Sequence, residues 1–255
     1  MTPSMIDSFR NAKMSKSQFG QKSSALFLAS ASVFISSLFS LFIPAAFALP
    51  ELAVKRKLET VVVYVAAENG GLVVFKDTQD SSRGLAPLFL DEKDANKYLS
   101  VNGKKSDLIV VPLLLTAAMS VVENIRRQVP NEFAEIKSQI VPTKVDRLEA
   151  QLILTKEGVP NDQILKGLRV PVFFTEPMIK LETSAGQRQL FFMSHAQLKD
   201  FIGKMPSDQS DKLLVRVADL NAVMKVIADN SKDLYLIYPS QELIDANPGM
   251  VDPDL

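Results

Sequence analysis

The sequence feature that most constrains the fold is an internal repeat. Residues 108–123 (LIVVPLLLTAAMSVVE) align with residues 213–228 (LLVRVADLNAVMKVIA), and six of the 16 positions are identical. In each segment an apolar run is followed by apolar residues at helical spacing, which is typical of a strand that leads into an amphipathic helix. We therefore expect one structural unit to occur twice in the chain.

Two further pairs of segments follow in the same order. Residues 61–65 (VVVYV) match residues 170–174 (VPVFF), and both runs are rich in the β-branched and aromatic residues of buried strands. Residues 88–99 and 191–202 share their large apolar positions, and each has a short apolar run before a helix. Three matches in one order indicate that the repeat extends through most of the chain.

The predicted fold is α+β, with two pseudo-symmetric strand-strand-helix-strand-helix units that form a two-lobed domain. The units cover about residues 60–126 and 169–230 of a domain that spans 49–240. Residues 241–255, which contain two prolines and a glycine, are predicted to form a C-terminal tail.

Local signals add detail to this plan. Residues 69–71 (NGG) predict a hairpin turn. Asp91 and Ser194 are good helix N-caps, and Ser194 with Gln197 forms a capping-box pattern. Residues 234–238 predict a last strand. Helical spacing predicts two helices separated by Pro142, one carrying Phe133, Ile136 and Ile140 and the other carrying Val145, Leu148, Leu152 and Ile153.

The first 48 residues read as a cleavable signal peptide. Residues 25–43 form an uncharged apolar run, four basic residues precede it, and Ala46 and Ala48 supply the small residues of a cleavage site before Leu49. An uncleaved membrane anchor is the alternative, since 19 apolar residues can span a bilayer. Without the segment, 25 basic and 28 acidic residues remain, a net charge of −3. This charge does not favour binding to nucleic acid.

The residue inventory gives little support to catalysis. The chain has no cysteine, so thiolate nucleophiles and Cys-ligated metals are excluded. Its one histidine, His195, is expected to face solvent at a helix start. Glycine-rich phosphate loops and serine-hydrolase motifs are absent from the sequence. We expect a protein that is not an enzyme and that takes no cofactor, metal or small-molecule substrate.

Six aromatic residues at matching places in the predicted strands are the candidate binding residues. Their ordinary role would be to fill a core between strand and helix. The alternative is a groove for apolar segments of another polypeptide, because neighbouring residues of a strand point to opposite faces. The candidates are Tyr64, Phe89, Phe173, Phe174, Phe191 and Phe192.

Several of these segments resemble one known family. Residues 167–175 (GLRVPVFFT) and 189–194 (QLFFMS), with residues 87–90 (PLFL) and 106–113 (SDLIVVPL) of the first copy, are similar to the Tic twenty-two family. This is the twenty-two-kilodalton subunit of the chloroplast inner-envelope translocon, with cyanobacterial relatives. The resemblance spans most of residues 52–240, while segments 76–83 and 144–161 depart from it.

The resemblance implies an exported, chaperone-like factor for protein translocation or outer-membrane protein biogenesis. Its partners would be unfolded or extended polypeptides and a barrel-assembly or translocon protein. The alternative is a structural scaffold that docks onto such a membrane partner without binding clients. The resemblance to a cyanobacterial-type member implies the periplasm, with the thylakoid lumen and the plastid intermembrane space as alternatives.

Overall fold

The computed structural model describes Leu49 and residues 51–103, 107–128, 133–183, 186–230 and 232–247. The predicted signal peptide, including Ala46 and Ala48, lies outside the described residues. The chain divides into two compact units. We call residues 55–145 the N-terminal unit, and residues 146–255 together with those up to Val54 the C-terminal unit. The prediction of an α+β fold is confirmed.

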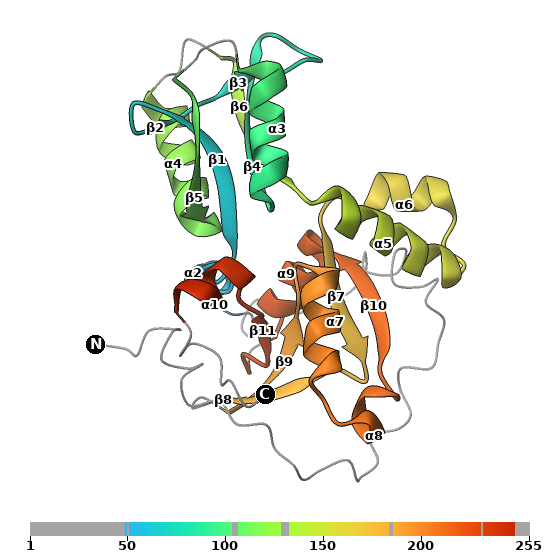
Figure 1. Ribbon diagram of the computed structural model, residues 1–255. Coiled ribbons are helices and arrows are strands. Elements are labelled where there is room, and N and C mark those ends of the chain that lie inside the picture. The colour runs from blue at the N-terminus through green and yellow to red at the C-terminus, as the bar shows by residue number, and fades with distance from the viewer. Residues whose placement is uncertain are drawn as a thin grey trace. The chain divides into compact units, whose positions relative to one another are not determined.

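The N-terminal unit is built on one mixed sheet (Figure 1). Strand β1 lies between β5 and β4, both antiparallel to it, and β6 pairs with β4 in parallel. The short strands β2 and β3 pair with β1 and β4. The elements are β1 Val62–Glu68, β2 Gly71–Leu72, β3 Phe75–Lys76, β4 Arg83–Phe89, α3 Glu92–Asn102, β5 Ile109–Leu114, α4 Leu115–Gln128 and β6 Glu135–Val141.

Helices α3 and α4 cover opposite faces of this sheet. Phe89 of β4 belongs to a core that includes Ala95 of α3, whereas Ala86 belongs to a core that includes Val122 of α4. Residues three apart on a strand point to opposite faces, so the two cores lie on the two sides of the sheet. Both faces are therefore closed by apolar side chains.

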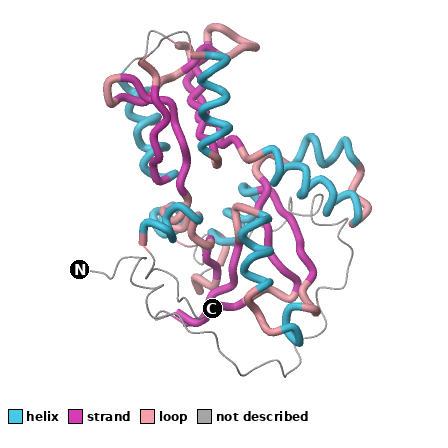
Figure 2. Tube along the Cα trace, viewed as in Figure 1, coloured by secondary structure: helices cyan, strands magenta, loops and turns pink. Residues whose placement is uncertain are grey.

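The C-terminal unit repeats the alternation of strands and helices (Figure 2). Strand β7 pairs antiparallel with β10 and is bridged to the end of β9 through Phe173 and Phe192. Strand β9 pairs antiparallel with β8 and parallel with β11. The elements are α5 Lys144–Lys156, α6 Asn161–Gly167, β7 Pro171–Glu176, β8 Lys180–Thr183, β9 Gly186–Phe191, α7 His195–Gly203, α8 Ser207–Ser210, β10 Leu214–Asp219, α9 Leu220–Ala228, β11 Tyr235–Ile237 and α10 Gln241–Ala246.

Several local predictions are confirmed by the backbone. The hairpin between β1 and β2 turns at Asn69 and Gly70, both with positive φ, as the Asn-Gly pair predicts. The side chains of Asp91 and Ser194 accept hydrogen bonds from Asp94 N–H and Gln197 N–H, so both are N-caps. The predicted last strand is β11, and the predicted helix beginning near Val145 is α5.

Two local predictions are wrong. The stretch with Phe133, Ile136 and Ile140 is not a helix; residues 135–141 form β6, because seven successive residues pair with β4. The capping box is incomplete, since the Gln197 amide donates to the Pro239 carbonyl at 2.6 Å and does not reach back to Ser194. Within the predicted tail, Gln241–Ala246 form helix α10.

One further helix, α2 (Glu51–Arg56), precedes β1 and crosses the boundary between the units in sequence. Just before it, Leu49 N–H donates to the Ala228 carbonyl at the end of α9, over 2.8 Å. The residue that would follow the predicted cleavage site is thus bonded to the C-terminal unit.

Candidate functional site

The two predicted aromatics of the N-terminal unit lie in its core. Tyr64 of β1 and Phe89 of β4 are register partners, and both are buried. The Phe89 ring lies 5.2 Å from the Tyr98 ring, centroid to centroid, on α3. These contacts are those of residues that fix a helix on a sheet.

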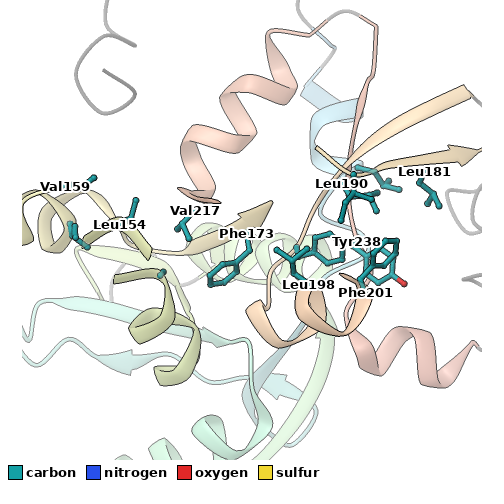
Figure 3. Close-up of a cluster of buried hydrophobic side chains, with 14 residues drawn as sticks. Leu154, Val159, Phe173, Leu181, Leu190, Leu198, Phe201, Val217 and Tyr238 are labelled. Carbon is teal, nitrogen blue, oxygen red and sulfur yellow. The ribbon is translucent and has the colours of Figure 1, made fainter. Parts of the chain in front are cut away.

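The four aromatics of the C-terminal unit divide between the two faces of its sheet. Phe173 and Phe192, 0% and 1% exposed, belong to a core that runs from the sheet to α5, α6 and α7 (Figure 3). Phe191 is also buried, and its ring lies 5.6 Å from that of half-buried Phe174. Adjacent aromatics are therefore both covered, because the sheet is packed on both sides.

The aromatic set consequently offers little surface to another molecule in this conformation. Five of the six rings are buried, and only Phe174 is half-buried. The pattern of the sequence located these residues in strands, but it could not show how many faces of each sheet are covered. An accessible apolar surface must lie elsewhere.

The position of His195 differs from the expectation. It does not face solvent: the side chain is buried and its ring lies 5.2 Å from that of Phe173. Burial lowers the pKa of His195 from its ordinary 6.5, while the nearby Glu149 carboxylate, 3.6 Å from Nδ1, acts in the opposite direction. The imidazole therefore favours the neutral form.

A second carboxylate near His195, that of Asp146, has a structural role. Asp146, at the start of α5, is buried and accepts a hydrogen bond from His195 N–H at 2.8 Å. It thereby satisfies one of the free N–H groups at the start of α7. This hydrogen bond connects α5 to α7, and Asp146 acts in it as a helix cap.

Arg216 fastens the other end of α5 to the sheet. Its guanidinium lies 2.8 Å from the carboxylate of Glu157, just after α5, and 2.8 Å from that of Glu176 at the end of β7. Such paired bonds to planar guanidinium groups are stronger and more directional than single surface pairs. Helix α5 is thus held at both ends.

Neither a metal site nor a membrane-spanning helix is found in the part of the chain that the structure describes. There, no group of three or more His, Asp and Glu side chains is placed to hold a metal ion. Within the same residues, no helix is both long and apolar enough to cross a membrane.

Helix α5 is apolar on two opposite sides. Ala150 and Leu154 face the core, whereas a row on the other side is open to solvent. We call this row the α5 stripe; it consists of Val145, Leu148 and Leu152, 65%, 50% and 55% exposed. Residues three and four apart lie on one face of a helix, so the three side chains form one strip. Leu165 on α6 is another exposed leucine of this segment.

The α5 stripe is the candidate functional surface. Single exposed apolar residues are ordinary, but a row of them on a helix that is already packed on its other side is typical of an interaction surface. The helical spacing of these residues was visible in the sequence. The sequence did not show which apolar side of α5 the core would cover.

Comparison with solved structures supports the resemblance. The structure of Tic22 from Anabaena, described as a protein-transport structure, matches with a TM-score of 0.59 over 80% of this chain and 99% of the other, at 16% identity. Tic22 from Plasmodium falciparum matches with a TM-score of 0.55 over 76% of this chain and 94% of that one, also at 16% identity. The chain has the Tic22 fold.

The sequence comparisons add nothing to this likeness. No family model matches the chain, and no curated protein matches it. At 16% identity the likeness to the two Tic22 structures lies in the arrangement of elements and not in particular side chains.

Proposed function

We propose that this chain is an exported protein-transport factor that binds unfolded or extended polypeptide clients. The fold it shares with Anabaena Tic22, which is described as a protein-transport structure, supports a role in protein translocation. The observation that carries client binding is the α5 stripe, an apolar strip on a helix whose other side is anchored in the core.

The energetics of the α5 stripe suit a client that must be released. Burying a leucine fully contributes about 1.5–3 kcal/mol, so a half-exposed leucine gains roughly half of that on contact. Leu148 and Leu152 together would add only a few kcal/mol before the cost of association. Such binding is weak and reversible, as escort of a polypeptide requires.

The proposed place of action follows from the N-terminal segment. A cleavable signal peptide would deliver the chain to the cyanobacterial periplasm, where translocon or outer-membrane barrel-assembly proteins are the proposed membrane partners. The bond from Leu49 N–H to Ala228 is compatible with cleavage after Ala48, since Leu49 would then be the first residue of the mature chain.

We infer further that the two units are copies of one ancestral unit. In support, β1 pairs antiparallel with β5 as β7 does with β10. The cross-strand pair of Tyr64 and Phe89 in one unit has its counterpart in Phe173 and Phe192 in the other. A parallel strand follows in each, β6 beside β4 and β11 beside β9.

A binding role also fits what the polar groups do. The Asp146 carboxylate holds the backbone of α7, and Arg216 joins α5 to the sheet. Both arrangements serve the fold. We therefore propose that the chain acts by binding and not by catalysis.

An aggregation assay tests the proposal. The purified chain should delay the aggregation of an unfolded outer-membrane barrel protein, and Leu148→Ser with Leu152→Ser should abolish the delay with only a small fall in the melting temperature. Val101→Ser is the matched control, because Val101 is 77% exposed in the other unit and should leave the delay unchanged.

Two results would contradict client binding through the α5 stripe. A chain that neither delays aggregation nor crosslinks to the client would overturn client binding. Capture of a folded translocon or barrel-assembly protein through the α5 stripe, with no effect on client aggregation, would establish the scaffold alternative.

A further inference from the structure

Strand β10 is an edge strand whose outer side is unpaired among the described residues. Its one strand partner there is β7. Leu220 N–H donates to Val170 across this pairing, and Phe173 exchanges hydrogen bonds with Phe192 on the opposite side of β7. Val217, which lies opposite Phe173, is therefore in a non-hydrogen-bonded pair.

The backbone groups of two valines consequently point away from the sheet. In an antiparallel pair, bonded and non-bonded positions alternate, so the N–H and C=O of Val215 and Val217 face outward. No hydrogen bond to these four groups joins them to any other described residue. They form a short row of donors and acceptors of the kind that another strand can pair with.

The corresponding strand of the N-terminal unit is blocked at this position. Leu115 N–H donates to Val61 as Leu220 N–H does to Val170, so the alternation is the same. Pro112, opposite Tyr64, occupies the outward position that Val217 occupies in β10. Proline has no N–H, and its place on an edge strand is a common protection against pairing with other chains. One edge is protected and the other is open.

We propose that the outer edge of β10 is a binding site for an extended polypeptide segment, which adds to the sheet as a further strand. The inference rests on the proposed function and gives it a mode of recognition: main-chain hydrogen bonds, which any extended sequence can make, with apolar side chains at alternate positions.

The side chains around the edge favour an apolar segment. Val217 belongs to the core that includes Leu154, and Val215 packs against the same core. An incoming side chain on that face would extend the core outward. Leu214 on the other face is 57% exposed. A charge on an edge normally repels a partner strand, but that of Arg216 is balanced by two carboxylates.

A second copy of the chain is a poorer occupant of this edge. A stable complex between folded proteins buries about 1,200–2,000 Å². A strand of six residues spans only about 20 Å, and pairing along it alone covers far less surface than that. An extended segment needs no such area, because its own backbone supplies the bonds.

Amide hydrogen exchange on the purified full chain tests the proposal directly. The probe is a synthetic peptide of alternating valine and threonine, about eight residues long, with lysines at both ends. We expect the amides of Val215 and Val217 to exchange about fivefold to tenfold more slowly with peptide, as one hydrogen bond of ordinary strength implies. The same peptide N-methylated at alternate residues should give no protection.

Variants separate backbone pairing from side-chain contact. Val215→Pro removes an outward N–H but no bond to β7, and it should weaken peptide binding about fivefold to tenfold, the cost of one such bond. Val215→Ala keeps the N–H and should bind nearly as well. In the other unit, Pro112→Val restores an N–H and should create new protection in β5.

The aggregation assay on the same samples distinguishes the two proposals. If the chain delays client aggregation but the Val215 and Val217 amides are not protected by peptide, the edge site is overturned and the proposed function stands. Equal protection by the N-methylated peptide also overturns the edge site. If the chain binds neither client nor peptide, both proposals fail.

Discussion

The two units share several strand pairings but differ at the junction of strand and helix. At the end of β10, the Asp219 carboxylate accepts hydrogen bonds from Arg169 N–H and Val170 N–H, just before β7 begins. The same carboxylate caps α9 by accepting a hydrogen bond from Asn221 N–H. The corresponding end of β5 is Leu114, an exposed apolar residue. Similar backbone geometry therefore does not require similar side chains. A carboxylate lies at the junction of β10 and α9, whereas a leucine lies at the junction of β5 and α4.

The units also differ in what covers the sheet. In the N-terminal unit the α3 face is covered by Ala95 and Tyr98 of α3 and by strand residues such as Val110 and Val141. In the C-terminal unit the α7 face continues into α5 and α6 through Leu154 and Ile164. The additional helices enlarge the core, and the far side of α5 is what presents the exposed leucines. The helices added to one sheet, and not the sheet itself, therefore present the surface that we propose for client binding.

The largest expected effect is on the larger core. Phe173→Ala removes a fully buried ring between the sheet and α7 and should lower the free energy of unfolding by about 3–5 kcal/mol. Phe174→Ala, on the next residue and half-buried, should cost clearly less. Urea denaturation of both variants provides the measurement. Equal losses would contradict the assignment of Phe173 to the main core.

A smaller effect is expected at the helix junctions. Asp219→Ala leaves three backbone N–H groups without their acceptor and should cost about 2 kcal/mol. Leu114→Ala at the corresponding place should cost only about 1 kcal/mol, because Leu114 is 37% exposed. Thermal and urea unfolding of the two variants will show the contrast. A greater loss of stability from Leu114→Ala than from Asp219→Ala would contradict the role given to the Asp219 carboxylate.

The N-caps of α3 and α7 should differ in the same way. Asp91 accepts from Asp94 N–H at 3.0 Å, whereas Ser194 accepts from Gln197 N–H at 3.5 Å. Because the shorter bond involves a carboxylate, Asp91→Ala should cost about 1 kcal/mol and Ser194→Ala about half of that. Conservative Asp91→Asn should restore most of the loss at α3, as measured by denaturation.

The smallest expected effect is a pH dependence confined to the C-terminal unit. Burial holds the pKa of His195 below 6.5, against the opposing influence of Glu149 and Asp146 and with help from Lys199. The unfolded chain therefore takes up a proton that the folded chain resists, and the free energy of unfolding should fall as the pH is lowered through 6.5.

His195→Gln is the control for this pH dependence. Unfolding followed at a series of pH values should show a shallower loss in the variant, because the chain has no other histidine. An unchanged slope would mean that His195 has the same proton affinity in the folded and unfolded chain.

The sequence alone determined the elements whose signals are local. The strands around Tyr64 and Phe173, the turn at Asn69 and the caps at Asp91 and Ser194 all lie where their residue types predict. Each depends on neighbours a few residues away: alternation, a positive φ, or a side-chain acceptor beside free N–H groups. Such forces act within one segment, so the segment contains them.

Only the tertiary structure decided which surfaces are covered. The spacing of Ile136 and Ile140 fitted a helix until pairing with β4 made the segment a strand. His195 was expected in solvent, and contact with Phe173 buries it. The exposed side of α5 and the outward position of Pro112 likewise follow from packing and register between segments far apart in sequence. A side chain is buried only when a second surface covers it, and the sequence of one segment does not specify which other segment will do so.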